Sequence, residues 1–212
     1  MGFGMHRLLL FLVFACSGVF ANAADEFTLN PATSEQLNKL REGGYVLFIR
    51  HGPTDSAYPD HVPVDLQDCT TQRPLTDAGR QLMLQVGEYM RQAGIPIGTV
   101  YSSPLCRAKE TADLLFGQGH YVVDNELMYV AALTDAEKQP IIARTHYLLS
   151  SAVTPGHNRI LVAHGPNMVE VMEYFPVEGT LVIIEADEDR QQFSYIASIE
   201  PDHWPRLLAE QE

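Results

Sequence analysis

Three short segments of the chain combine arginine or histidine with glycine, serine or proline. They are Arg50-His51-Gly52, the run Ser102-Ser103-Pro104-Leu105-Cys106-Arg107, and Ala163-His164-Gly165. An imidazole nitrogen can attack phosphorus, and a guanidinium group can hold phosphate oxygens in a fork. Glycine allows the backbone to approach a ligand closely. Two histidines and two arginines could therefore surround one phosphoryl group, provided that the fold brings the three segments together.

The pattern of apolar residues predicts alternating strands and helices. Strands are expected at residues 45–50, 98–102 and 159–163, with a late strand pair at 180–186 and 193–199. Helices are expected at 34 to about 40, at 77–92 after Thr76 as N-cap, from Ser103 as N-cap to about 116, at 135–150, and from 167. This alternation is typical of a layered α/β domain with a mostly parallel sheet.

The three chemically capable segments fall at equivalent positions in this pattern. Arg50-His51, Ser102-Ser103 and His164 each follow the carboxyl end of a predicted strand. In open α/β sheets, ligands bind beyond that end. Arg107 lies in the first turn of its predicted helix, where a positive charge is unfavourable unless an anion accompanies it. The pattern therefore indicates an anion site at one edge of the sheet.

The overall composition is acidic, in contrast to this local cluster of arginine and histidine. The 212 residues include 27 acidic and 14 Lys or Arg residues, which gives a formal charge of −13. A chain this acidic is a poor candidate for binding nucleic acid, because phosphate backbones require a basic face. The remaining histidines are scattered without metal-ligand spacing, so we expect no metal and no other cofactor. The sequence does not indicate an oligomeric state.

Residues 1–23 are predicted to be a secretory signal peptide. Arg7 precedes an apolar run at 8–14 that is too short to span a bilayer comfortably, and Ala21-Asn22-Ala23 forms a cleavage site. An uncleaved anchor and a lipoprotein modified at Cys16 are the alternatives. We therefore expect residues 24–212 to form a single domain in the periplasm or outside the cell, with no stable membrane span after processing.

Two cysteines, Cys69 and Cys106, remain after such processing. In an oxidising compartment they predict one disulfide, and two buried thiols are the alternative. Cys69 belongs to a long segment, residues 53–74, that is rich in proline and aspartate and could cover a site. A bridge would tie this segment to the Arg107 helix. Arg73, in the same segment, could add a positive group to the site.

Four motifs in order resemble the histidine phosphatase superfamily, which has the phosphoglycerate-mutase-like fold. They are Arg50-His51-Gly52, Leu75 to Arg80, Ser102-Ser103-Pro104 through Thr111, and Ala163-His164-Gly165. The resemblance covers roughly residues 43–200. It implies a three-layer sandwich, with a mostly parallel central sheet flanked by helices.

The same resemblance implies roles for individual residues. His51 would be the nucleophile that becomes phosphohistidine, and Arg50, Arg107 and His164 would form the phosphate pocket. Gly52 would let the substrate approach, and Arg73 could contribute a further charge. The implied substrate is a small phosphorylated molecule, and the cationic side chains would make a metal unnecessary.

The general acid is where the chain departs from the family pattern. Many members carry a glutamate in an Asp-x-x-Leu-x-Glu stretch, whereas residues 124–129 place Tyr129 at that position. Glu126 is the favoured substitute, with Asp55 and Glu178 as alternatives. For each of the three taken alone, a solvated surface carboxylate is the simpler interpretation.

These features predict an exported phosphatase that hydrolyses a phosphomonoester through a phosphohistidine on His51. A phosphotransferase or mutase of the same fold is one alternative. A catalytically silent protein that binds a phosphorylated ligand is the other, since the general acid is not evident from the sequence.

Overall fold

A computed structural model of the chain describes residues 1 and 27–210. Apart from Met1, the predicted signal peptide, with Arg7, Cys16 and Ala23, lies outside the described residues. Within the described part, no helix is both long enough and apolar enough to cross a membrane. The elements in chain order are α1 (Ser34–Glu42), β1 (Tyr45–Arg50), the 3-10 helix η1 (Cys69–Thr71), α2 (Asp77–Gln92), β2 (Ile97–Ser102), α3 (Cys106–Phe116), β3 (Val122–Val123), the 3-10 helix η2 (Asn125–Leu127), α4 (Asp135–Ser150), β4 (Asn158–Ala163), α5 (Gly165–Met172), β5 (Leu181–Asp187), β6 (Gln192–Ile199) and α6 (Trp204–Ala209).

One sheet of six strands, in the order β3-β2-β4-β1-β5-β6, organises these elements. The strands β3, β2, β4 and β1 pair in parallel, whereas β5 is antiparallel to both β1 and β6. Only β5 therefore runs against the other strands, and the prediction of a mostly parallel sheet is confirmed.

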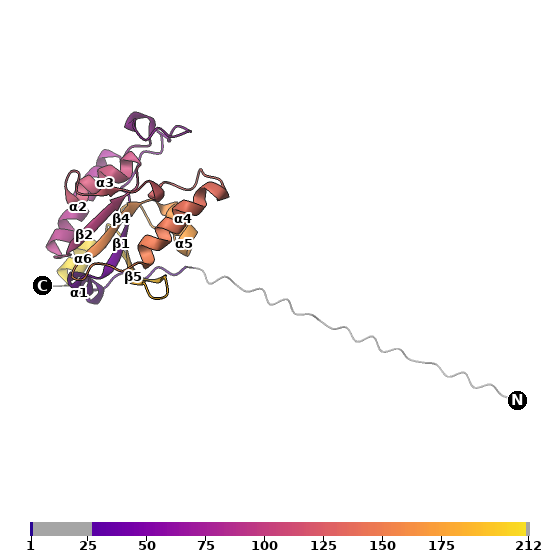
Figure 1. Ribbon diagram of the computed structural model, residues 1–212. Helices are drawn as coiled ribbons and strands as arrows, with labels where there is room; N and C mark the ends of the chain where they lie inside the picture. The colour runs from indigo at the N-terminus through magenta and orange to yellow at the C-terminus, as the bar shows by residue number, and fades with distance from the viewer. Residues whose placement is uncertain (2–26, 211–212) are drawn as a thin grey trace.

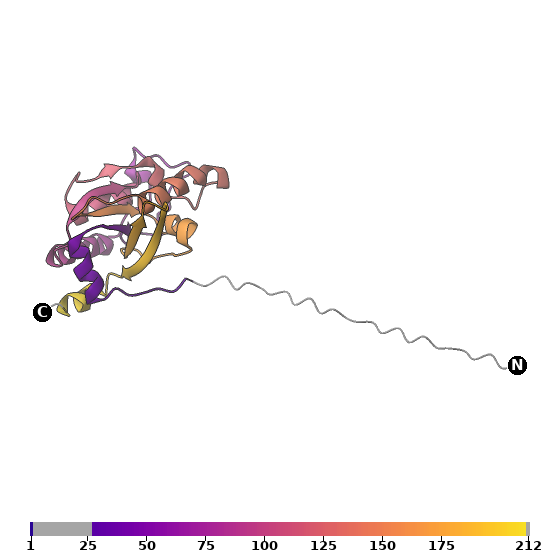
Figure 2. The ribbon, with the colours of Figure 1, turned by 60° about the horizontal axis from the view of Figure 1, so that its bottom comes forward.

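Helices cover both faces of the sheet, because its central strand is apolar on both sides. In β1, Leu47 and Ile49 pack in one cluster with residues of α1, α2, α3 and α6. Val46 and Phe48 point to the other face and pack with residues of α4 and α5. Figure 1 shows α2 and α3 on one side of the sheet and α4 and α5 on the other, and Figure 2 shows α1 beside α6. The three-layer sandwich is thus confirmed.

Most predicted element boundaries agree with the structure, and the start of α3 does not. Ser103 is not its N-cap: the helix begins at Cys106, with Leu105 at the N-cap position. The Ser103 hydroxyl instead lies 2.7 Å from His164 Nε2 and accepts a hydrogen bond from the Leu105 amide. The Ser103 side chain, which the sequence pattern assigned to the start of the helix, therefore makes a tertiary contact instead. The helix after β4 also begins two residues early, at Gly165.

A disulfide between Cys69 and Cys106 joins η1 to the first residue of α3, as predicted. The two Cα atoms are 5.7 Å apart across 37 positions of sequence. The amide of Cys106 also donates a hydrogen bond to the buried Gln72 side chain, 2.8 Å away. The 53–74 segment is therefore attached to α3 next to Arg107 by one covalent and one hydrogen bond.

Candidate active site

The carboxyl ends of three parallel strands bring the predicted site residues together. Arg50 in β1 pairs with Ala163 in β4, and Ser102 in β2 pairs with Val162 in β4. Beyond these pairs the His51 amide donates to Ala163 O, 3.0 Å away. The ring centroids of His51 and His164 consequently lie 5.2 Å apart.

The His51 ring is buried and held in one tautomer. Its Nδ1 lies 2.9 Å from the carbonyl oxygen of Gly52. Because a carbonyl can only accept, Nδ1 carries the proton and Nε2 keeps its lone pair. Burial, and then the positive charge of Arg107, lower the pKa of His51 well below its ordinary value of 6.5. At neutral pH the ring is therefore an uncharged imidazole with a nucleophilic Nε2.

Gly52 is fixed at its position by close packing. Its amide donates to the Thr111 hydroxyl, 3.0 Å away. A Cβ atom at residue 52 would lie 2.5 Å from Cγ of Met83. A larger residue would therefore shift the residue 52 carbonyl, which accepts the hydrogen bond from Nδ1 of His51.

Arg107 and Arg73 supply buried guanidinium donors. Arg107 is 1 % exposed, and its Nη1 lies 2.9 and 3.1 Å from the two carboxylate oxygens of Asp60. Its Nε and Nη2, like Nε of Arg73, have no hydrogen-bond partner among the described residues. Buried charged donors are costly unless they are paired, so these atoms favour an anionic ligand.

Arg50 approaches the site from the side of the loop before β5. Its Nη1 donates to the Pro176 carbonyl, 2.6 Å away, and its guanidinium stacks 4.4 Å above the Phe175 ring. Its Nη2 is 3.5 Å from Glu178 Oε1. The stack and the two polar contacts hold the guanidinium at the end of β1.

His164 is fully buried beside an aromatic ring and feels the positive charge of the arginines of the site. Burial, and then the charge of Arg107, lower its pKa well below the ordinary value. Its Nδ1 has no partner among the described residues, and Tyr129 packs edge-on at 5.5 Å between ring centroids. Tyr129, which stands where the resemblance described above would place a glutamate, also lies 5.4 Å from the guanidinium of Arg107, measured to the ring centroid. A phenol ring thus forms one wall of the site.

The candidate acids occupy different surroundings. Glu126 is exposed on η2, where its amide donates a hydrogen bond to the Asp124 carboxylate, and Asp55 accepts a hydrogen bond from the amide of Ala57. Glu178 is closer to His51, with Oε1 3.9 Å from Nδ1, and it accepts hydrogen bonds from the hydroxyl and amide of Thr54.

Asp60 is the carboxylate that the sequence did not single out. It pairs with Arg107 and accepts a hydrogen bond from the amide of Arg73, 2.7 Å away. Its only signal in the sequence is membership of the 53–74 segment, which carries several acids. No group of three or more His, Cys, Asp or Glu side chains within the described residues could hold a metal ion.

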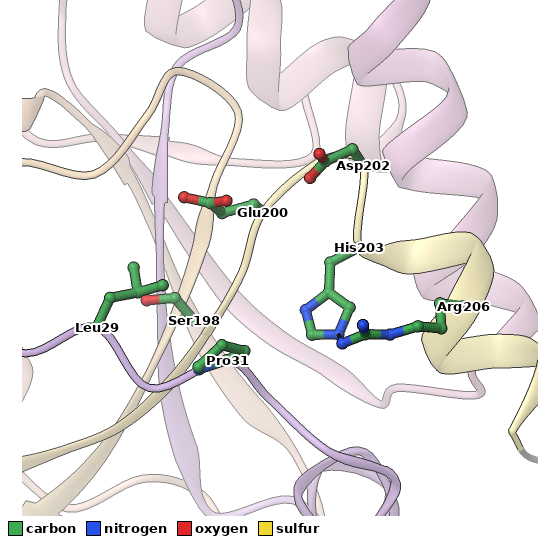
Figure 3. Close-up of a pocket in the computed structure, with 7 residues that line it drawn as sticks. All are labelled: Leu29, Pro31, Ser198, Glu200, Asp202, His203 and Arg206. Atoms are coloured by element: carbon green, nitrogen blue, oxygen red, sulfur yellow. Dashed lines mark hydrogen bonds between the residues drawn. The ribbon is translucent and has the colours of Figure 1, made fainter.

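A separate pocket of about 270 Å³ lies between the N-terminal segment of the described chain and α6. Figure 3 shows Glu200 and Asp202 at its upper rim and His203 beside Arg206 at the start of α6. The Arg206 guanidinium is already hydrogen-bonded to His203, with 2.7 Å between Nη2 and Nε2. The seven residues drawn do not include the arginines or histidines of the candidate site, so this pocket is distinct from it.

Comparison with known families matches residues 46–132 to the model described as "Histidine phosphatase superfamily (branch 1)". A curated relative is the mitochondrial serine/threonine-protein phosphatase Pgam5 of Drosophila grimshawi. It is 30% identical over 81 residues, which cover 38% of this chain and 25% of the relative. The chain thus matches about a quarter of the length of that relative.

Solved structures share the fold at low sequence identity. One is described as an alpha-ribazole-5'-P phosphatase from Escherichia coli, with a TM-score of 0.54, 17% identity, and coverage of 74% of this chain and 97% of that one. Another, mycobacterial hydrolase 1, has a TM-score of 0.52 and 16% identity, covering 73% and 98%. The protein histidine phosphatase SixA complexed with tungstate has a TM-score of 0.50 and 19% identity, covering 74% and 97%.

Proposed function

The chain belongs to the histidine phosphatase superfamily, and we propose that it hydrolyses phosphomonoesters through a phosphohistidine on His51. One observation carries this proposal: Nδ1 of His51 is committed to the Gly52 carbonyl, which leaves Nε2 free at the carboxyl edge of the sheet. Unpaired guanidinium nitrogens of Arg107 and Arg73 lie in the same cluster. A neutral nucleophile beside fixed positive charge suits attack on a phosphate.

In the first step, Nε2 of His51 attacks phosphorus in line. The Nε2–P bond forms as the bond from phosphorus to the ester oxygen breaks, and that oxygen takes a proton as it leaves. Arg50, Arg107 and Arg73 donate to the remaining phosphoryl oxygens. The Ser103 hydroxyl can donate to His164 Nε2, which leaves a proton on His164 Nδ1 for a phosphoryl oxygen.

In the second step, water attacks the phosphohistidine and regenerates His51. A carboxylate must take a proton from that water, and in its acid form it protonates the leaving oxygen of the first step. We assign this role to Asp60, because it contacts Arg107 from the open side of the site. Glu126 remains the prediction from the sequence, and the two assignments are separated below.

Export of the protein is part of the proposal. The sequence of residues 1–23 and the Cys69–Cys106 disulfide support a catalytic domain at residues 24–212 in an oxidising compartment. There the substrate would be a small phosphorylated molecule, and the site residues need no metal for the steps above.

Phosphate transfer to His51 tests the proposal. After brief incubation with acetyl phosphate and quenching, we expect acid-labile, base-stable phosphate on His51 and steady release of inorganic phosphate. His51→Ala should abolish labelling and lower turnover by at least about a thousandfold. His157→Ala, an exposed histidine at the opposite end of β4, is the control and should behave as wild type.

Two results would contradict the proposal. A folded protein that binds phosphate but never labels would be a silent binding protein. Transfer of the label to an added alcohol in preference to water would indicate a phosphotransferase.

A further inference from the structure

A cavity of about 510 Å³ lies between the 53–74 segment and the residues that connect η2 to α4. Its volume falls within the range of roughly 300–1,000 Å³ that is usual for ligand pockets. The apolar part of its wall comes from both sides and includes Val62, Val64, Leu105, Met128 and Leu133.

This cavity opens directly beside the phosphate site. Asp60, Arg73 and Tyr129 line it. Two of them contact the phosphate-binding groups, since Asp60 pairs with Arg107 and Tyr129 packs against both Arg107 and His164. Arg73 is itself one of the groups proposed to bind phosphate. A phosphomonoester with its phosphoryl group at His51 would therefore extend its alcohol portion into the cavity.

Few hydrogen-bonding groups are available along the rest of the wall. The Glu137 carboxylate is occupied by the N-terminus of α4, where it accepts hydrogen bonds from the amide and hydroxyl of Thr134. Asp60 and Arg73 belong to the phosphate end. The exposed His61 and the phenol hydroxyl of Tyr129 remain as the other polar side-chain groups of the lining. These two groups are too few to replace the hydrogen bonds to water that a polyhydroxylated ligand would lose here.

We propose that the cavity binds the alcohol portion of the substrate, and that the preferred substrates are phosphomonoesters of apolar ring or branched alcohols rather than sugar phosphates. This inference rests on the proposed phosphatase activity. Binding of an apolar group against this wall is favourable because it removes hydrocarbon from water. Arg73 and Asp60 mark the end of the cavity where the ester oxygen would meet the phosphate site.

Cyclohexylmethyl phosphate and glucose 6-phosphate form a matched pair for the test. Both carry a six-membered ring on a primary phosphorylated carbon, and they differ mainly in ring hydroxyls. Those hydroxyls withdraw electrons, so leaving-group chemistry alone would favour the sugar. We expect kcat/KM to be at least about tenfold higher for cyclohexylmethyl phosphate.

Two variants and a control locate this preference in the cavity. Leu133→Asn and Met128→Ser should each lower the ratio of the two kcat/KM values at least about threefold. Leu84→Asn, at an exposed leucine of α2 outside the cavity, should leave the ratio unchanged. Because both substrates are measured on the same preparation, the ratio is insensitive to partial misfolding.

Acetyl phosphate, whose acetate leaving group is too small to fill the cavity, separates failure of this inference from failure of the proposed function. Hydrolysis of acetyl phosphate with equal or better use of glucose 6-phosphate would overturn the apolar substrate class and leave the phosphatase activity standing. A ratio that neither cavity variant changes would overturn the assignment of the cavity. Absence of turnover with all three compounds would overturn both.

Discussion

The chemistry proposed for His51 depends on what lies on each side of its ring. The Gly52 carbonyl fixes the proton on Nδ1, and burial beside Arg107 keeps the ring uncharged. The residue types at positions 50–52 could be predicted as a phosphate site from the sequence. The tautomer could not, because it depends on the position of the Gly52 carbonyl, which is set by the close packing of Gly52 against Met83.

The two candidate acids can be distinguished by their dependence on the leaving group. We expect Asp60→Asn to lower kcat for an alkyl phosphate by about a hundredfold or more, because an alkoxide leaves poorly without a proton. The loss should be much smaller for acetyl phosphate, which needs little protonation. The measurement is kcat for both substrates in Asp60→Asn and in Glu126→Gln.

A purely electrostatic role for Asp60, through its ion pair with Arg107, would change both substrates alike. An equal loss on the two substrates would therefore contradict the assignment. A selective loss in Glu126→Gln would return the role to the residue favoured by the sequence.

At the level of secondary-structure elements, a boundary could be predicted where it depends on neighbouring residues and not where it depends on contacts distant in sequence. The bounds of β1, α2 and α4 were predictable, because local residue patterns define them and Thr76 marks the start of α2 as its N-cap. The start of α3 was not, because Ser103 contacts His164, which is 61 positions away in sequence. Asp60 was missed for the same reason: its partner Arg107 belongs to another element.

The disulfide between η1 and α3 yields a prediction about activity. Cys69 carries the 53–74 segment, which includes Asp60 and Arg73, and Cys106 immediately precedes Arg107. Reduction, or the Cys69→Ser/Cys106→Ser variant, should lower kcat/KM about tenfold or more, because the segment can then move away from Arg107. Stability should fall by about 2–4 kcal/mol. Activity is to be measured well below the unfolding temperature.

Fluorescence of the buried Trp204 reports whether the fold survives reduction. We expect the fluorescence to stay native while the rate falls. An unchanged rate in reductant would show that the bridge has no role in the site.

On the scale of the whole molecule, the site concentrates positive charge in an acidic protein. The formal charge is −13, yet Arg50, Arg73 and Arg107 converge where the parallel strands end. Each arginine lowers the proton affinity of the buried histidines around it. The fold therefore holds two imidazoles neutral in its interior, and this arrangement has a consequence for stability.

Stability should decrease when the pH falls below about 6.5. His51 and His164 have depressed pKa values in the folded protein, whereas in the unfolded chain they titrate at the ordinary value of 6.5. Below pH 6.5 the unfolded state thus binds more protons, so the stability present above that pH is lost as the pH falls toward the folded pKa values. Each histidine contributes a slope of up to about 1.4 kcal/mol per pH unit.

Urea unfolding at pH 7.5, 6.5 and 5.5 in phosphate-free buffer measures this slope, since a ligand of the folded state would mask it. Because Asn does not titrate, His164→Asn should flatten the slope between pH 6.5 and 5.5 by up to about 1.4 kcal/mol per unit. The exposed His157, replaced by Ala, should leave the slope as in wild type. If His164→Asn kept the full slope, the acid sensitivity would have to come from groups other than this buried imidazole.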